Sequence, residues 1–216
     1  PKVCDNYRTF SLINHIGKVM EKMIQFRLHK YCEDMKYLPE SQNGFRNGRS
    51  TIDSLLVSRL LSISARKRGA NLYKYFIDLT KAYDKVNREI LWEVLKHRGV
   101  PSGMINLIKG IHEGAQASLR IKGEIVSQFP LNTGLKQGSV FSPLLFNIFF
   151  GVIIDIWKRE VEALGVDILV RINGNFLDAK NFNGKGVGCT TEQLCELLFA
   201  DDAEIVATSP KDLQSM

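Results

Sequence analysis

The sequence has few of the residues that cross-link small secreted domains or bind zinc. Its 216 residues include only four cysteines and four histidines. No two cysteines form a C-x-x-C pair, and the histidines do not cluster with them. This usage argues against a disulfide framework and against a zinc site, and it is typical of a reducing, intracellular compartment.

Long apolar runs and targeting sequences are also missing. The longest apolar stretch, Leu144–Ile154, is interrupted by Asn147 and Gly151, and it is too short to span a membrane. No signal or transit peptide is recognisable. We therefore expect an intracellular protein that does not enter a membrane. The sequence begins at Pro1 without a methionine, and we expect it to be a piece of a longer polypeptide.

The composition is that of a globular protein, but the charge is unevenly distributed. Apolar residues make up 44% and charged residues 24% of the chain, which is enough for a core that needs no cross-links. Residues 1–72 carry 13 basic and 6 acidic side chains, whereas residues 73–216 carry 16 and 17. A basic first third is typical of a surface that meets an anionic partner. A solvated basic face would give the same count, so charge alone leaves both interpretations open.

Hydrophobic periodicity and capping signals predict a mixture of helices and antiparallel strands, that is, an α+β fold. Helices are predicted over residues 16–31, 51–68, 88–98, 102–112 and 142–164, with Ser50 and Ser102 as N-caps. Strands are predicted over residues 72–79, 117–121, 124–129, 166–172, 194–200 and 203–207. The dipeptide Asn173-Gly174 predicts a tight hairpin after residue 172, and Asp201-Asp202 forms the tip of the last hairpin.

Three carboxylates stand where apolar strands end. Asp78 ends the strand predicted over residues 72–79, and Asp201 and Asp202 separate the last two strands. If these strands are neighbours, the three carboxylates converge, and they provide the ligand set of hard divalent cations and of a two-metal phosphoryl-transfer site. A turn tip in water and a helix cap would explain the same residues without a metal. Spacing alone does not show that the strands are adjacent.

The sequence resembles the reverse transcriptases of non-LTR (LINE-type) retrotransposons in five blocks that occur in the same order. Residues 76–84 (FIDLTKAYD) are similar to their first catalytic motif, residues 134–144 (GLKQGSVFSPL) to their Gln-Gly motif, and residues 199–202 (FADD) to their aromatic-Ala-Asp-Asp box. Upstream, residues 6–12 and residues 42–51 (QNGFRNGRST) resemble the finger blocks. The resemblance covers nearly the whole chain.

This resemblance implies the fingers and palm of a right-hand polymerase, with an antiparallel palm sheet backed by helices and with the thumb absent. The implied boundaries are fingers over residues 1–72, palm over 73–90, fingers or connection over 91–130, and palm over 131–216.

The implied activity is that of an RNA-directed DNA polymerase, which transfers nucleotides from dNTPs to a primer 3′-hydroxyl with two Mg²⁺ ions or, as a substitute, Mn²⁺. The implied partners are an RNA template, a DNA primer, dNTPs, and the thumb and endonuclease regions of a longer polyprotein. The implied location is the nucleus or the cytoplasm.

For the site, the resemblance makes Asp78, Asp201 and Asp202 the catalytic and metal-binding carboxylates. Tyr83 would lie under the deoxyribose and exclude a 2′-hydroxyl; the alternative interpretation of this residue is an ordinary core aromatic. Glu204, close after the Asp pair, would place one more acid near the metals.

Nucleotide and template contacts follow from the same resemblance. Gln137 and Gly138 would pack against the incoming nucleotide, because glycine permits close backbone approach. Arg8 would bind the triphosphate, and Arg46 and Arg49 would bind template phosphates. The family usually has Pro-Ile or Gly-Ile after the Tyr-Arg pair, whereas this chain has Thr-Phe after Arg8.

Two other functions remain open at this point. A catalytically silent or domesticated copy would keep nucleic-acid affinity without turnover, although all three carboxylates are present. A phospho-receiver domain also gathers carboxylates around Mg²⁺, but there the acidic pair comes first in the chain, whereas here Asp78 precedes the pair.

Overall fold

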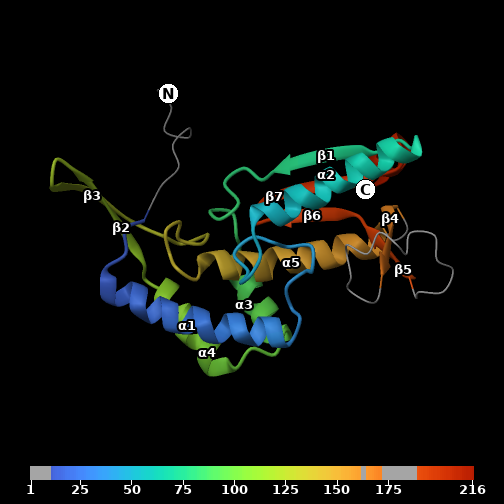
Figure 1. Ribbon diagram of the computed structural model, residues 1–216. Helices are drawn as coiled ribbons and strands as arrows, with labels where there is room; N and C mark the ends of the chain where they lie inside the picture. Colours follow the sequence, from blue (N-terminus) through green and yellow to red (C-terminus); the bar gives the residue numbers. More distant parts are fainter. Residues whose placement is uncertain (1–10, 162–163, 172–188) are drawn as a thin grey trace.

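The computed structural model describes residues 11–161, 164–171 and 189–216, in which helices and antiparallel strands are mixed (Figure 1). The helices are α1 (His15–Asp34), α2 (Thr51–Arg68), α3 (Arg88–His97), α4 (Ser102–His112), α5 (Ser142–Glu160) and α6 (Pro210–Ser215). The strands are β1 (Tyr73–Asp78), β2 (Gln116–Ile121), β3 (Glu124–Pro130), β4 (Val166–Arg171), β5 (Cys189–Leu194), β6 (Glu196–Phe199) and β7 (Asp202–Ala207).

The central sheet has the strand order β1-β7-β6, and both pairings are antiparallel. In the first pairing Asp78 lies opposite Asp202, and in the second Phe199 lies opposite Asp202. This register leaves Ala200 and Asp201 as a two-residue turn between β6 and β7. The strands that carry the three carboxylates are therefore neighbours, as the site prediction required.

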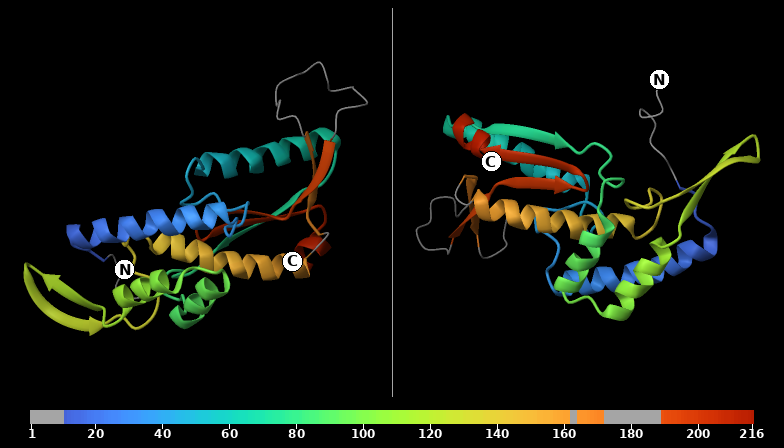
Figure 2. Two further views of the ribbon diagram at one scale, coloured as in Figure 1. Left: turned by 90° about the horizontal axis from the view of Figure 1, so that it is seen from below. Right: turned by 180° about the vertical axis from the view of Figure 1, so that it is seen from behind.

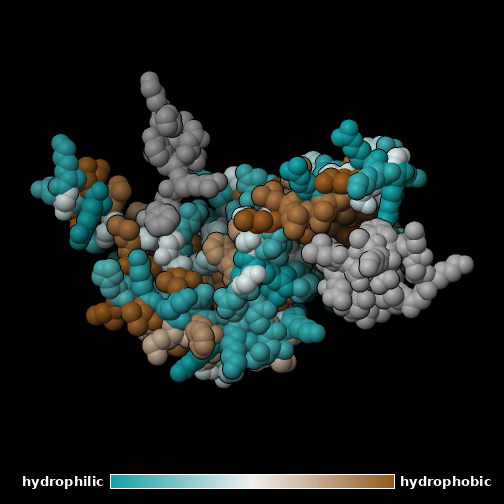
Figure 3. Space-filling view, in the orientation of Figure 1, coloured by the Kyte–Doolittle hydropathy of each residue, from teal (hydrophilic) through white to brown (hydrophobic). Residues whose placement is uncertain are grey.

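The sheet lies between α2 and α5, and α1, α3 and α4 lie on the far side of α5 (Figures 1 and 2). Successive side chains of a strand point to opposite faces of the sheet, so one set packs against α5 and the other against α2. Leu198 and Ala203, which oppose each other in the register, join the main hydrophobic core with α5. Glu204, one residue further along β7, points to the other face and reaches Ser58 of α2. The β2–β3 hairpin projects away from this body (Figures 1 and 3).

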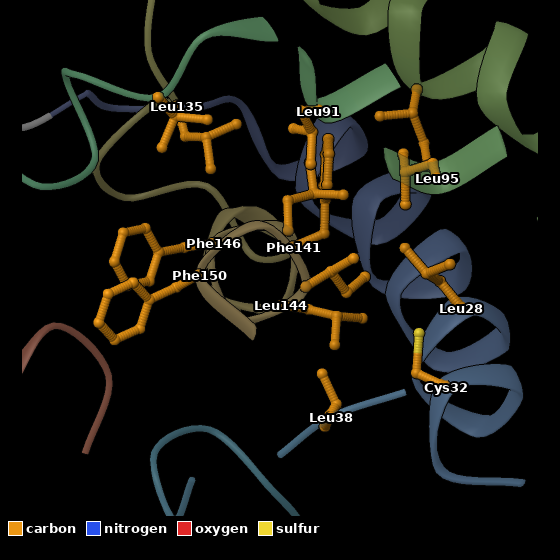
Figure 4. Close-up of a cluster of buried hydrophobic side chains, with 14 of the residues drawn as sticks. Leu28, Cys32, Leu38, Leu91, Leu95, Leu135, Phe141, Leu144, Phe146 and Phe150 are labelled. Atoms are coloured by element: carbon orange, nitrogen blue, oxygen red, sulfur yellow. The ribbon is translucent and has the colours of Figure 1, made fainter. Parts of the chain in front are cut away.

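The hydrophobic core surrounds the first half of α5 (Figure 4). Helix α5 begins at Ser142-Pro143, where proline is favoured because its missing N–H is not needed. Leu28 of α1, Leu91 of α3 and Leu144 of α5 are all buried in this cluster. Because α5 contacts both layers, it fixes the position of the sheet relative to the helices.

Two boundary predictions need correction. Helix α5 ends at Glu160 instead of residue 164, with Lys158 and Arg159 in its last turn, where cations favour a C-terminus. Ser102 is the first helical residue of α4, and the N-cap is Pro101, whose carbonyl accepts the first helical bonds. Strand β4 pairs with β5, and the tight hairpin predicted at Asn173-Gly174 lies outside the described residues.

Among the described residues, no helix is long and apolar enough to cross a membrane.

His112 connects α4 to the core and gives the fold a predictable pH dependence. Its ring packs edge-on against Trp92 and Phe141, with centroids 5.6 Å apart in both pairs, and Nδ1 lies 2.9 Å from the Ile108 carbonyl oxygen. Burial lowers the pKa of His112 to about 4, from about 6.5 in an unfolded chain. The unfolded chain therefore binds the extra proton first as pH falls.

We expect this residue to lower the free energy of unfolding by about 2–3 kcal/mol as pH falls from 6.5 to 4, and to contribute almost no pH dependence above about pH 7.5. Urea unfolding of the wild type and His112→Phe across pH 4–7 measures the effect. Carboxylates titrate in both proteins, so the difference between the two curves isolates His112. Parallel curves would contradict the prediction.

Candidate active site

The carboxylates occupy one end of the central sheet. Asp78 is the last residue of β1, Asp202 is the first residue of β7, and the two are direct cross-strand partners. The Cβ atoms of such partners lie about 4.5–5.5 Å apart on the same face. Asp201 precedes Asp202 in the turn, whose first residue, Ala200, has a φ of 56°. Asp78 and Asp202 are exposed, and Asp201 is half-buried.

A cleft of about 490 Å³ opens beside the carboxylate pair. It is lined by residues of three segments, 79–84, 136–143 and 199–202, together with Phe45. Asp201, Asp202, Tyr83, Gln137 and Gly138 are all among the lining residues, whereas Asp78 stands next to the cleft without lining it. A larger cavity of about 880 Å³ beside α3 and α4 is lined by none of the predicted site residues.

Tyr83 stands between the cleft and the core. Its ring stacks on Phe146 of α5, with the centroids 4.9 Å apart, and the ring of Phe150 continues the stack behind Phe146 (Figure 4). Burial, and then the negative charge of Asp201, raise the pKa of Tyr83 well above its ordinary value. The phenol therefore stays neutral, and its ring is held rigidly beside the carboxylates.

The Gln-Gly loop is fixed to the segment that follows β1. The Leu135 N–H donates to the Tyr83 carbonyl at 2.8 Å, and the Gly134 N–H donates to the Val86 carbonyl at 3.1 Å. Gly138 has a φ of 101°, a conformation that favours glycine. These bonds hold the loop against one wall of the cleft.

Two charged side chains that the sequence analysis did not identify support this loop. Glu21 of α1 is buried, and its carboxylate accepts bonds from the Ser139 hydroxyl at 2.9 Å and the Val140 N–H at 2.8 Å. Arg88 donates to the carbonyls of Leu131 and Gly134, both at 2.7 Å. These partners are far apart in the sequence, so no local pattern could have revealed them.

Glu204 does not add a free charge to the site. The carboxylate is only 8% exposed, and it forms an ion pair with Lys74 Nζ at 2.8 Å. The Ser58 hydroxyl of α2 donates a further bond at 2.9 Å. Lys74 therefore balances the charge of Glu204 beneath α2.

Comparison with known proteins agrees with this geometry. The protein family described as reverse transcriptase (RNA-dependent DNA polymerase) matches the chain over residues 1–216. The chain belongs to the reverse transcriptase family. Similar curated reverse transcriptases include the probable RNA-directed DNA polymerase from transposon X-element of Drosophila melanogaster, which is 32% identical over 76% of this chain and 18% of that protein. The RNA-directed DNA polymerase from mobile element jockey of the same organism is 31% identical over 69% of this chain and 16% of that protein.

Similar solved structures include those of telomerases. Apo telomerase from Candida tropicalis, truncated from its C-terminal domain, has a TM-score of 0.56 and 15% identity, over 91% of this chain and 35% of that one. Telomerase from Candida albicans in complex with a fragment of telomeric RNA also has a TM-score of 0.56, with 11% identity over 92% and 31% of the two chains. At this identity the likeness shows the reverse transcriptase fold alone. The chain spans less than a fifth of the length of the curated relatives quoted above.

Reverse transcriptases generally use divalent metal ions, and the chemistry of the carboxylate cluster fits such ions. Carboxylate oxygens are the donors that hard cations prefer, and a cation would offset the repulsion between directly opposed Asp78 and Asp202. Within residues 11–161, 164–171 and 189–216, however, no three His, Cys, Asp or Glu side chains are arranged to hold a metal. The backbone of this chain brings Asp78, Asp201 and Asp202 to one edge of the sheet, but their side chains as they stand do not form a metal site.

The three arginines that were predicted to bind phosphates differ in their surroundings. Arg8 lies outside the described residues. The Arg46 side chain is 6% exposed and forms a two-bond ion pair with Glu33, at 2.7 and 2.9 Å, which lowers the pKa of that carboxyl. Arg49 pairs with Glu40. Neither Arg46 nor Arg49 lines the cleft. Because each is paired with a carboxylate, a template phosphate would have to compete with that carboxylate, and their role in template binding stays a prediction.

Proposed function

We propose that this chain is the fingers and palm of an RNA-directed DNA polymerase from a non-LTR retrotransposon. It would copy an RNA template by adding dNTPs to the 3′-hydroxyl of a DNA primer. The observation that carries the proposal is the direct opposition of Asp78 and Asp202 beside a cleft that also holds Tyr83 and the Gln-Gly loop. Residues 1–72 and 91–130 would form the fingers and connection, and residues 73–90 and 131–216 would form the palm.

In the proposed mechanism, Asp78, Asp201 and Asp202 would hold two Mg²⁺ ions, for which Mn²⁺ can substitute. Bound ions of this kind lower the pKa of an attacking hydroxyl and stabilise charge on a leaving group. The contribution of the chain itself is to hold the carboxylates in position. The strand register places Asp78 of β1 directly opposite Asp202 of β7, and the turn between β6 and β7 adds Asp201. Catalysis would then depend on alignment and charge stabilisation without a covalent enzyme intermediate.

The nucleotide would lie in the cleft between the carboxylates and the Gln-Gly loop. Gln137 and Gly138 present backbone and a half-buried side chain to this space. The stacked, neutral Tyr83 offers a flat surface on which a deoxyribose can rest. Arg8, Arg46 and Arg49 stay candidates for the triphosphate and template phosphates.

Primer extension tests the proposal against a silent, nucleic-acid-binding copy. The wild-type chain is assayed with dNTPs and Mg²⁺ or Mn²⁺ on RNA and DNA templates, and template–primer binding is measured in parallel. Extension on the RNA template supports the polymerase. Binding without extension, both by this chain and by a chain extended through the thumb, would favour the silent copy.

Tyr83 carries a separate prediction about sugar selection. Tyr83→Ala removes the ring that would meet a 2′-hydroxyl, so we expect the preference for dNTPs over rNTPs to fall at least about tenfold. Tyr83→Phe keeps the ring on Phe146 and should retain the preference. Single-nucleotide incorporation kinetics with matched dNTP and rNTP provide the measurement. An unchanged preference in Tyr83→Ala would refute the role.

A further inference from the structure

The side chain of Gln42 is buried against the turn that carries Asp201 and Asp202. Gln42 is 1% exposed. Its Oε1 accepts a hydrogen bond from the Ala200 N–H at 2.8 Å, and its Nε2 donates to the Ala200 carbonyl at 3.1 Å. A single amide group therefore binds both backbone polar groups of the residue directly before Asp201.

Ala200 needs such a partner for two reasons. Its φ of 56° is in the left-handed region, which a residue with a Cβ adopts at a cost. It is also buried, so its N–H and carbonyl cannot be satisfied by bulk water. Without the Gln42 amide, the left-handed conformation of Ala200 would lose the hydrogen bonds that stabilise it. The turn would then relax into another conformation, and Asp201 and Asp202 would move with it.

The backbone around Gln42 is itself held tightly. The Asn43 N–H donates to the Leu198 carbonyl at 2.9 Å, and the Leu198 N–H donates to the Ser41 carbonyl at 3.0 Å. This short parallel bridge attaches the segment to β6.

Gly44 completes the attachment. Its N–H donates to Gln42 Oε1 at 2.8 Å, and its carbonyl accepts a bond from Asn147 of α5 at 2.7 Å. A Cβ on Gly44 would lie 2.3 Å from the Ala200 nitrogen, so only glycine allows this approach. The backbone segment that carries Gln42 is therefore bonded both to β6 of the sheet and to α5.

We infer that Gln42 is a positioning residue for the carboxylate pair. Its amide fixes the Ala200-Asp201 turn, and the turn fixes where the two carboxylates stand relative to Asp78 and the cleft. Because Gln42 is buried, it acts through the turn and does not touch substrate. The inference rests on the proposed function, since it assumes that these carboxylates bind the ions used in nucleotide transfer.

The test compares Gln42→Met, Gln42→Glu and a matched control, Gln214→Met, in the same chain. Methionine has similar length but offers no strong donor or acceptor for Ala200. Glutamate keeps an oxygen that can accept a bond from the Ala200 N–H. When the carboxyl is ionised, however, its second oxygen has no proton to donate to the Ala200 carbonyl and repels it. Gln214 lies exposed on α6, away from the cleft, so its replacement should leave every measurement unchanged.

For Gln42→Met we expect kcat to fall about 100-fold, because displacement of reacting groups by about 1 Å has such an effect. The KM for dNTP and the Kd for template–primer should change by no more than about threefold, since the fall in kcat arises at the carboxylates. Mn²⁺ binding, followed by electron paramagnetic resonance without nucleotide, should weaken about 10- to 100-fold. Amide hydrogen exchange in residues 197–205 should accelerate.

Gln42→Glu provides a rescue in case Gln42→Met folds poorly. Burial favours the neutral carboxyl, whose O–H can again donate to the Ala200 carbonyl. The ratio of its kcat to that of the wild type should therefore rise as pH is lowered from 8 to 6.

Three results would overturn the inference. The first is a Gln42→Met variant that matches an active wild type in kcat, Mn²⁺ affinity and exchange. The second is a parallel loss of kcat, template affinity and overall stability, with no pH rescue in Gln42→Glu, which would indicate a merely structural residue. The third is a wild type that neither extends a primer nor binds Mn²⁺, which would overturn the proposed function as well.

Discussion

Replacing Asp201 by asparagine is expected to reduce kcat for nucleotide incorporation by about 1000-fold or more, because metal-assisted charge stabilisation contributes several kcal/mol to such a reaction. Asparagine has nearly the same shape and keeps one oxygen, but it lacks the charge that would hold an ion. Asp201 occupies the turn between β6 and β7 and lines the cleft. Loss of its charge should act on the chemical step and leave the fold in place.

The matched control is Asp167→Asn, which removes an exposed carboxylate on β4 outside the cleft. Both variants lose one negative charge, so a difference between them reports position and not net charge. Single-turnover primer extension measures the chemical step, and urea unfolding checks that both variants are folded. Equal incorporation by Asp201→Asn and the wild type would refute the assignment of the carboxylate pair.

Replacing Gly134 by alanine is expected to lower the free energy of unfolding by about 3 kcal/mol, because strain and overpacking both apply. Gly134 has a φ of 71°, and a Cβ there would lie 2.6 Å from the Asp84 carbonyl oxygen and 2.7 Å from the Asp84 Cα. These are backbone atoms that cannot rotate away. The loop would have to shift, and Gln137 and Gly138 would shift with it.

The variant Gly69→Ala separates the cost of backbone strain from the cost of overpacking. Gly69 ends α2 with a φ of 63°, and a Cβ there would meet nothing within 4 Å. Only the left-handed strain applies, so we expect a loss of about 1 kcal/mol. Urea unfolding of the two variants measures the difference, and Gly134→Ala should also raise the KM for dNTP. Equal losses in both variants would show that close approach to Asp84 is not what requires glycine at residue 134.

Local signals predicted most elements of the fold. Ser50 and Asp53 form the capping box at the start of α2, and Gly69 ends that helix, as their residue types indicate. The β2–β3 hairpin turns at Lys122-Gly123, between the two strands predicted over residues 117–121 and 124–129. Such signals depend on neighbouring residues, so they can be read before any tertiary contact is known.

The site was predictable only to the level of its motifs. The family resemblance named Asp78 and Asp202, but it did not supply the register that places them opposite each other. Contacts between distant segments were missed. Gln42 and Ala200 are 158 residues apart, and Glu21 and Ser139 are 118 residues apart. No periodic pattern connects residues so far apart, because their meeting depends on how whole elements pack.

The basic first third shows the same limit of sequence reasoning. Its excess of positive charge suggested a surface for nucleic-acid phosphates. In the structure, Arg46 and Arg49 are paired with Glu33 and Glu40, so part of the charge already has a partner within the chain. A count of charges cannot distinguish an arginine that holds two segments together from one that faces solvent.

The pairing of β1 with β7 determines when the site can form during synthesis. β1 is an edge strand, and its partner in the described sheet is separated from it by more than a hundred residues. Until β7 has left the ribosome, β1 lacks the strand with which it pairs in the described sheet, and its backbone N–H and carbonyl groups stay unpaired. The nascent chain can build the α5 core first, but Asp78 must wait for Asp202. A chain that ends between α5 and β6 would therefore contain most of the helical core, but it would have an unpaired, aggregation-prone β1 and would lack Asp201 and Asp202.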